Sequence, residues 1–153
     1  MKEETSPRSL AILVAEDNHQ TGISIQSAVA SERAKCLLCY VKSSGELLDY
    51  LHKNNRFSGE NSKPLPDLIL LDLDFEKLGQ ATLHHLKADP HLRAIPLIAL
   101  IDPLDKKGAD EAYECGASSC IVKPATPDGV GQMLADLEHY WLNVVKLPNK
   151  RTI

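Results

Sequence analysis

Five short runs of mostly apolar residues recur along the chain, and a longer segment with a helical period follows each of them. The runs are the length of strands that are buried on both faces of a sheet. They lie at Leu10–Ala15, Cys36–Val41, Leu68–Leu71, Leu97–Ile101 and Ser119–Val122. The pattern therefore predicts five strands, each followed by a helix.

Capping residues mark several ends of the expected helices. Asn18 is expected to begin the first helix, and Ser43 the second, where Ser43 and Glu46 have the spacing of a capping box. Thr126 followed by Pro127 is typical of the start of a last helix. The expected helices span about 18–31, 43–51, 81–88, 106–115 and 126–143.

Strands that alternate with helices predict an α/β fold, in which helices cover both faces of a parallel sheet. We expect a flavodoxin-like, doubly wound sheet of five strands in the order 2-1-3-4-5. A chain of 153 residues is one domain by length. We place the folded domain at residues 10–146, between an N-terminal tail (1–9) and a C-terminal tail (147–153). The polar segment 54–66 is expected to be an exposed loop, and Gly116 to end the fourth helix.

Composition and charge exclude several classes of function. The net charge is −4 and no basic run is longer than Lys150-Arg151, so no nucleic-acid partner is expected. The start of the chain is polar and no apolar run approaches about 20 residues, so we expect a soluble, cytoplasmic protein without a membrane contact. Cys36 and Cys39 have CxxC spacing, but they lie on an expected strand, where residues three apart point to opposite faces. We interpret all four cysteines as packing residues.

Charged residues stand at the ends of three expected strands. Glu16 and Asp17 end the first, Asp72 ends the third, and Lys123 follows the fifth. In an open parallel sheet, ligands bind at the edge where the carboxyl ends of the strands lie. Three clustered carboxylates repel one another, so they must protonate, bind a cation or hold a lysine. Mg²⁺ fits best, because it takes oxygen ligands. A carboxylate beside Mg²⁺ and a lysine can attack phosphorus and form an acyl phosphate.

These residues make the chain resemble the receiver domain of two-component response regulators. The resemblance covers about Leu10 to Trp141, and it rests on Glu16-Asp17, on Pro66–Asp72, on Gly116-Ala117 and on Lys123-Pro124. It implies a phosphorelay protein that is itself a phosphoprotein. By this resemblance Asp72 is the phosphoacceptor and Lys123 contacts the phosphoryl group. Glu16, Asp17, Asp72 and the backbone carbonyl of Asp74 would hold Mg²⁺.

A narrower resemblance is to the regulators that serve bacterial phytochromes, notably in cyanobacteria. It rests on the long segment before Asp67, on Lys87–His91, and on the ending Tyr140–Leu142 with Leu147-Pro148. It implies a sensor histidine kinase of the phytochrome type as partner and a homodimer formed through the C-terminal part. No output domain is expected, so the effector would be a separate protein or the kinase itself. The expected chemistry is self-directed, and we do not expect an enzyme with a separate substrate.

The chain departs from the family pattern at positions that transmit the signal. The family has Ser or Thr where this chain has Ile101, and an aromatic residue where it has Cys120. Isoleucine cannot donate a hydrogen bond to an oxyanion. One reading is a phosphoacceptor with an unusual output. The other is a pseudo-receiver that docks partners without being phosphorylated. A third, from another class, is a flavin or small-molecule binder, but the acids after the first strand would repel a phosphate.

Two further groups of residues carry expectations. The histidines are scattered, and the adjacent pair His84-His85 should diverge around a helix, so we interpret both as helix-surface residues. We hypothesise that His19 approaches the mouth of the acidic pocket. The consecutive large residues Tyr140–Leu142 cannot all face inward on one helix, so at least one should be exposed or in a contact.

Overall fold

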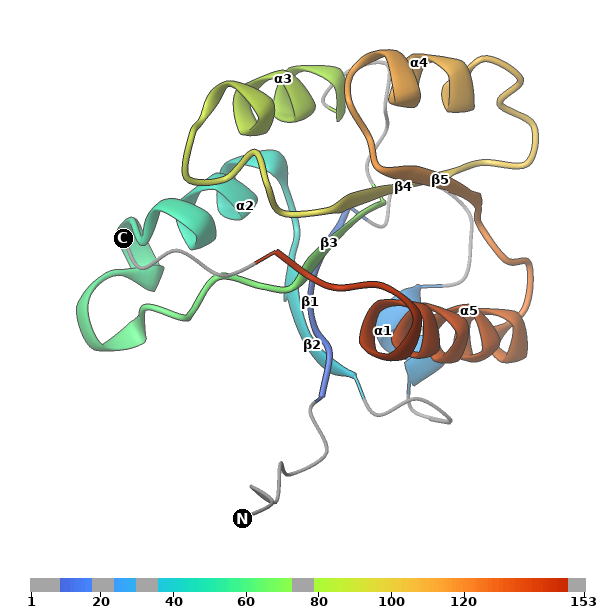
Figure 1. Cartoon of the computed structure of the whole chain (residues 1–153), viewed down its shortest axis with the longest axis horizontal. Helices are drawn as coiled ribbons and strands as arrows, with labels where there is room; N and C mark the ends of the chain where they lie inside the picture. Colours follow the sequence, from blue (N-terminus) through green and yellow to red (C-terminus); the bar gives the residue numbers. More distant parts are fainter. Residues whose placement is uncertain (1–8, 18–23, 30–35, 73–78, 149–153) are drawn as a thin grey trace.

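The computed structural model describes residues 9–17, 24–29, 36–72 and 79–148. Its centre is a five-stranded parallel sheet in the order β2-β1-β3-β4-β5 (Figure 1). This confirms the predicted fold class and strand order. The strands are β1 (Ala11–Glu16), β2 (Leu37–Val41), β3 (Leu68–Asp72), β4 (Leu97–Ile101) and β5 (Ser119–Val122).

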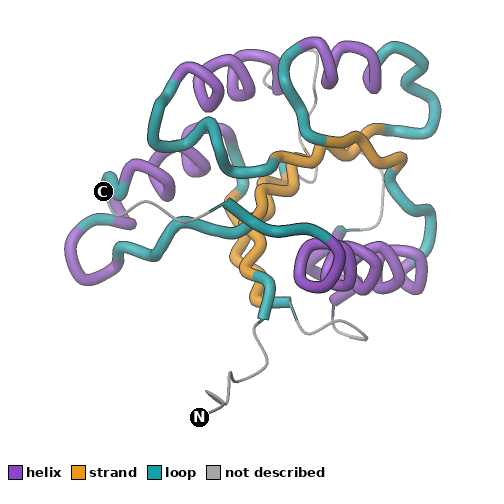
Figure 2. The backbone as a smooth tube through the Cα atoms, viewed as in Figure 1, coloured by secondary structure: helices purple, strands orange, loops and turns teal. Residues whose placement is uncertain are grey.

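Helices cover both faces of the sheet. They are α1 (Ile25–Ala28), α2 (Ser44–His52), α3 (Gln80–Ala88), α4 (Gly108–Glu114) and α5 (Pro127–His139). Helices α1 and α5 lie together on one side, and α2, α3 and α4 lie on the other (Figure 1). Figure 2 shows the strands as one twisted layer between the two groups of helices. None of the described helices is long and apolar enough to cross a membrane.

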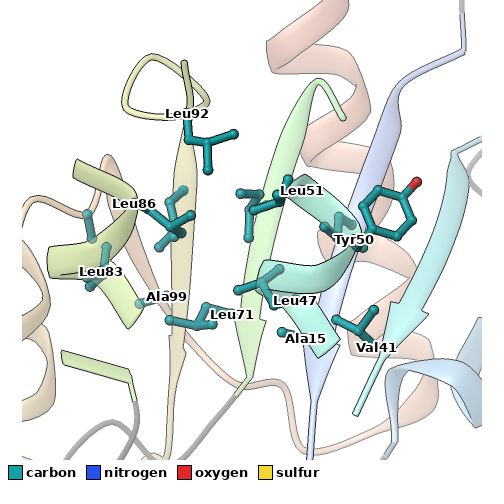
Figure 3. Packing of buried hydrophobic residues seen from close by; sticks show 14 of the residues in the cluster. Ala15, Val41, Leu47, Tyr50, Leu51, Leu71, Leu83, Leu86, Leu92 and Ala99 are labelled. Carbon is teal, nitrogen blue, oxygen red and sulfur yellow. The ribbon is translucent and has the colours of Figure 1, made fainter. Parts of the chain in front are cut away.

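Alternate residues of the inner strands point to two separate hydrophobic clusters. Leu13 of β1 and Leu71 of β3 pack under α2, α3 and α4, and Figure 3 shows part of this cluster. Their neighbours Val14 and Leu70 pack under α1 and α5. All four are at most 1% exposed, and burying such a side chain contributes about 1.5–3 kcal/mol. The continuous apolar runs exist because the inner strands are buried on both faces.

The start of α2 shows how the sequence sets a helix boundary. The Ser43 hydroxyl accepts a hydrogen bond from the Glu46 N–H at 3.1 Å, as predicted. The Glu46 carboxylate accepts from the Lys42 N–H at 2.9 Å, one residue earlier than in an ideal capping box. Together these bonds satisfy one backbone donor just after β2 and one in the first turn of α2, and they fix the direction in which the chain leaves the sheet.

Other helix boundaries agree with their sequence signals. The Thr126 hydroxyl accepts a hydrogen bond from the Gly129 N–H at 3.0 Å, with Pro127 in the first turn of α5. Gly116 follows α4 with a φ of +102°, a conformation that favours glycine. Helix α5 ends at His139 and continues as a π-helical turn at Tyr140–Val144. The expected cap at Asn18 lies outside the described residues.

The segment 54–66 is only partly the exposed loop that its polar composition predicts. It contains two short 3-10 turns, Asn55–Phe57 and Gly59–Asn61. Phe57 and Leu65 are buried, with 9% and 8% of their surface exposed. The Phe57 ring packs edge-on against Tyr50 of α2, with ring centroids 5.0 Å apart. Two apolar residues in a polar stretch therefore fasten this connection to the core.

The cysteines pack as predicted. Cys36 donates its thiol to Glu138 of α5 at 3.5 Å, whereas Cys39 packs on the cluster under α2. The two thus point to opposite faces of the sheet, and all four cysteines, which lie in the described part, are outside any disulfide.

Candidate functional site

The acidic residues that end β1 and β3 meet because these strands are neighbours. Glu16 is the register partner of Asp72 in the parallel ladder. The Asp17 N–H donates to the Asp72 carbonyl at 3.4 Å, which continues the pairing one residue beyond β1. Residues that are 56 positions apart in the chain thus stand side by side at the carboxyl edge of the sheet.

Lys123 joins this group from a strand that does not touch β3. Its backbone N–H donates to the Ile101 carbonyl at 2.8 Å, which places it just beyond β5, next to β4. From there its side chain passes the end of β4, and Nζ lies 2.5 Å from Asp72 Oδ2. The two side chains are only 16% and 15% exposed, so this ion pair is largely removed from water.

Burial and charge act on Asp72 in opposite directions. The largest effect is desolvation, which raises the pKa of the Asp72 carboxyl above its usual value. The hydrogen bond and the positive charge of Lys123 lower the pKa, while the charges of Glu16 and Asp17 raise it further. The net effect is a raised pKa, so the ionised form of Asp72 is energetically unfavourable in the absence of another cation. A bound divalent cation would favour the ionised carboxylate, so the raised pKa is consistent with a cation site.

Glu16 has a structural contact that the sequence pattern does not reveal. Its side chain is 5% exposed, and Oε1 accepts a hydrogen bond from the Ile25 N–H at 2.9 Å. Ile25 is the first residue of α1. The carboxylate therefore satisfies a backbone donor at the start of a helix, where negative charge is favourable. One of its oxygens is engaged in this way.

The donor chemistry at this edge fits Mg²⁺. Glu16, Asp17 and Asp72 offer carboxylate oxygens, and their combined negative charge exceeds the single charge of Lys123. Asp74 lies outside the described residues, as does His19. Within the described ranges, no three His, Cys, Asp or Glu side chains stand close enough to hold a metal ion as they are placed. The backbone thus brings the acids together, and side-chain adjustment would have to complete an ion site.

The two unusual positions of the sequence lie on β4 and β5, next to Lys123. Ile101 is buried with 8% exposed, and a Cβ atom on Gly108 of α4 would lie 3.2 Å from its Cγ2. Cys120 donates its backbone N–H to the hydroxyl of Tyr113 at 3.2 Å. Tyr113 belongs to α4, and sequence reasoning missed it because the aromatic residue is expected on β5 itself. Ile101 is thus held by apolar contact, and the neighbouring helix brings a tyrosine hydroxyl to the backbone of Cys120.

Comparison with known proteins decides the family. No protein-family model matches the chain. A solved structure, the response regulator RPA3017 in red light signaling of R. palustris, is 30% identical, with a TM-score of 0.79, over 92% of this chain and 99% of that one. The chain belongs to the response regulators.

Two further relatives place the chain near the phytochrome response regulators. The curated response regulator Rcp1 of Synechocystis sp. is 27% identical over 149 residues, which are 97% of this chain and 99% of Rcp1. The phosphorylated cyanobacterial phytochrome response regulator RcpA is 28% identical over 93% of this chain and 100% of that one, with a TM-score of 0.73. A structure of Rcp1 is described as its Mn²⁺-bound form. The chain is thus a receiver-type protein of two-component signalling that resembles phytochrome response regulators.

Proposed function

We propose that this chain accepts a phosphoryl group on Asp72 from the phosphohistidine of a sensor histidine kinase. The observation that supports this most directly is the contact of Lys123 Nζ with Asp72 Oδ2 beside two further acids. An Asp72 carboxylate oxygen attacks phosphorus and forms the new O–P bond. The P–N bond to the imidazole breaks, and the imidazole keeps the electron pair and regains a proton. The product is an acyl phosphate, which water later hydrolyses.

In this proposal Glu16, Asp17 and Asp72 would hold Mg²⁺, with the backbone carbonyl of Asp74. When bound, the ion would neutralise charge on the transferring group. Lys123 pairs with Asp72 before transfer and would then follow the negative charge onto the phosphoryl oxygens. Because burial of Lys123 and Asp72 excludes water, this charge pairing is stronger than at an open surface. The chemistry takes place on the chain itself, so no separate substrate is proposed.

The test is direct phosphorylation with a small donor. The protein is incubated with Mg²⁺ and acetyl phosphate, and intact mass is measured. We expect the added mass of one phosphoryl group in the parent chain and none in Asp72→Asn. The matched control is Asp102→Asn, because Asp102 is an exposed acid that directly follows β4, and this variant should be labelled like the parent. Labelling that persists in Asp72→Asn would refute the assignment.

A second candidate function, a docking module that is not phosphorylated, is favoured by Ile101 and Cys120. Neither residue supplies the hydroxyl or the aromatic ring of the family pattern, and Ile101 is packed against α4. In this case a partner binds the chain equally well with or without Mg²⁺ and acetyl phosphate. An absence of label, together with unchanged partner affinity for Asp72→Asn, would select this function over phosphotransfer.

We further propose that the sensor kinase is of the phytochrome type and that the chain meets it in the cytoplasm. The support is that RPA3017 is a response regulator in red light signaling and that RcpA is a cyanobacterial phytochrome response regulator. The downstream partner would be a separate protein. The test compares the rate of phosphotransfer from phytochrome kinases and from unrelated histidine kinases. Equal rates with both classes would refute the preference.

We also propose a homodimer through the C-terminal helix and the edge strand β5. Tyr140 is 47% exposed, which agrees with the expectation that at least one of Tyr140–Leu142 is exposed. Val122 of β5 is 55% exposed. A hollow of about 570 Å³ lies between α5 and β5, with Met133, Leu137 and Trp141 among its lining residues. A second copy would cover this apolar surface through a two-fold interface. Sedimentation should give a dimer that Tyr140→Glu converts to a monomer, and a monomeric parent chain would refute it.

A further inference from the structure

Two histidines from different helices meet at the surface over α2 and α3, away from the acidic pocket. His52 is the last residue of α2, and His85 lies within α3. Their Nε2 atoms are 3.2 Å apart, and the rings are nearly perpendicular, with centroids 5.4 Å apart. The adjacent His84 points elsewhere, toward Cys115, which directly follows α4, with Nε2 3.9 Å from Sγ. The predicted divergence of His84 and His85 is therefore correct, and it turns His85 toward His52.

Packing of the hydrophobic core fixes the positions of these two histidines. Leu51 precedes His52 and Leu86 follows His85, and both leucines are buried, at 0% and 2% exposed. Figure 3 shows them in the core cluster, on α2 and α3. Because each leucine holds its helix in one rotation, the neighbouring histidines are directed toward each other at the outer side of the helix pair. Both rings remain accessible from solvent.

A carboxylate completes the group. Asp89 follows α3, and its Oδ2 lies 3.8 Å from His52 Nε2. Its backbone carbonyl accepts from the N–H groups of Leu92 and Arg93, at 3.1 and 2.9 Å, and its Oδ1 accepts from the His91 N–H at 2.8 Å. These bonds hold the Asp89 backbone and orient its side chain. Oδ2 is thereby left facing the His52 imidazole.

We infer that His52 and His85, with Asp89, bind one divalent transition-metal ion of the Zn²⁺ class. Two nitrogen ligands of tetrahedral Zn²⁺, each at 2.0–2.1 Å from the ion, stand about 3.3 Å apart. The observed separation of the two Nε2 atoms, 3.2 Å, is close to this spacing, although the two rings are hydrogen-bonded to each other without an ion. Each ring would have to turn so that both Nε2 atoms point at the ion. Two imidazoles and one carboxylate, with water in the fourth position, form a ligand set that zinc accepts. Asp89 Oδ2 lies 3.8 Å from His52 Nε2 and would have to move toward the ion, because no three His, Cys, Asp or Glu side chains of the described residues are placed to hold a metal as they stand.

This site differs from the acidic pocket in chemistry and in place. Imidazole nitrogens select zinc-like ions, whereas the all-oxygen pocket suits Mg²⁺. Helices α2 and α3 run away from the carboxyl edge of the sheet, so the last residue of α2 lies far from Asp72. In Figure 3 Leu51 lies toward the opposite end of the cluster from Ala15 and Leu71, which precede the acids of the pocket. An ion bound here would link α2 to α3 directly, and the inference does not depend on phosphotransfer.

The test is titration with ZnCl₂ by isothermal calorimetry on the full chain without a polyhistidine tag. Saturating Mg²⁺ is present throughout to occupy the acidic pocket. We expect one equivalent of Zn²⁺ to bind, with a dissociation constant that rises at least about tenfold in His52→Ala and in His85→Ala. The matched control is His139→Ala, because His139 is an exposed helix histidine whose ring contacts Asn143, and this variant should bind like the parent.

A second readout separates ligation from folding. Zn²⁺ should raise the thermal midpoint of the parent chain and leave those of His52→Ala and His85→Ala unchanged. Circular dichroism checks that each variant is folded, and His52→Gln replaces any alanine variant that is not. Three results would overturn the inference. They are no saturable binding by the parent, unchanged binding in either histidine variant, and loss of binding in His84→Ala alone, which would assign the ion to the His84–Cys115 pair.

Discussion

Replacement of Lys123 by methionine should destabilise the fold in a way that depends on pH. The change removes the Nζ atom that lies 2.5 Å from Asp72 Oδ2. It leaves a carboxylate that is 15% exposed, in the presence of the like charges of Glu16 and Asp17. Loss of one partner from a buried pair costs about 3–5 kcal/mol, and exposed pairs are worth far less. Because some solvent reaches this pair, we expect a loss of about 2–3 kcal/mol at neutral pH.

The direction of the pH effect follows from the pKa of Asp72. Burial already raises this pKa in the parent, and Lys123 opposes the rise, so the pKa of Asp72 should be higher still in the variant. A carboxyl whose folded-state pKa is raised carries no penalty below its unfolded pKa, about 3.9. The penalty develops as the pH increases through the folded-state pKa. The variant should therefore approach the parent in stability at acid pH and fall behind it toward neutral pH.

Urea denaturation at several pH values, with a chelator to remove divalent ions, measures this difference. The fluorescence of Trp141, the single tryptophan, reports unfolding because the side chain packs on the core under α5. Lys146→Met is a control at an exposed lysine and should have little effect. In the Asp72→Asn background, Lys123→Met should cost much less. An equal cost at every pH, or in both backgrounds, would show that Lys123 acts through packing and refute the electrostatic argument.

Three further predictions concern stability and can be measured by chemical denaturation. Asp67→Ala should cost about 1.5–3 kcal/mol, because the buried Asp67 carboxylate accepts from the Ala11 N–H at 2.9 Å; an unchanged midpoint would contradict this role. Ser43→Ala should cost about 1 kcal/mol by removing the cap on the Glu46 N–H, and Ser43→Thr should retain most of the stability. Gly116→Ala should cost about 1–2 kcal/mol because its φ is +102°. A stabilising effect of this last change would show that the turn relaxes.

The sequence alone determined the architecture because its signals are local. Each inner strand is a continuous apolar run, and that pattern requires burial on both faces of a sheet. Caps such as Ser43 and Thr126 fix helix starts within a few residues, so these boundaries were predicted closely. The acids were also identified from sequence, since a polar residue directly after a buried strand in an α/β fold must lie at the carboxyl edge. For the same reason Glu16 and Asp72 were expected together.

The tertiary structure alone decided which side chains touch. Hydrophobic periodicity gives the face of an element and not the identity of its neighbour, so no pattern could show Glu16 bonded to the Ile25 N–H. The reach of Lys123 past β4 to Asp72 depends on strand order and side-chain length together. The meeting of His52 with His85, which are 33 residues apart in the chain, depends on how the core fixes the rotation of their two helices. Such contacts arise only when distant segments are packed against one another, and that packing is a property of the whole fold.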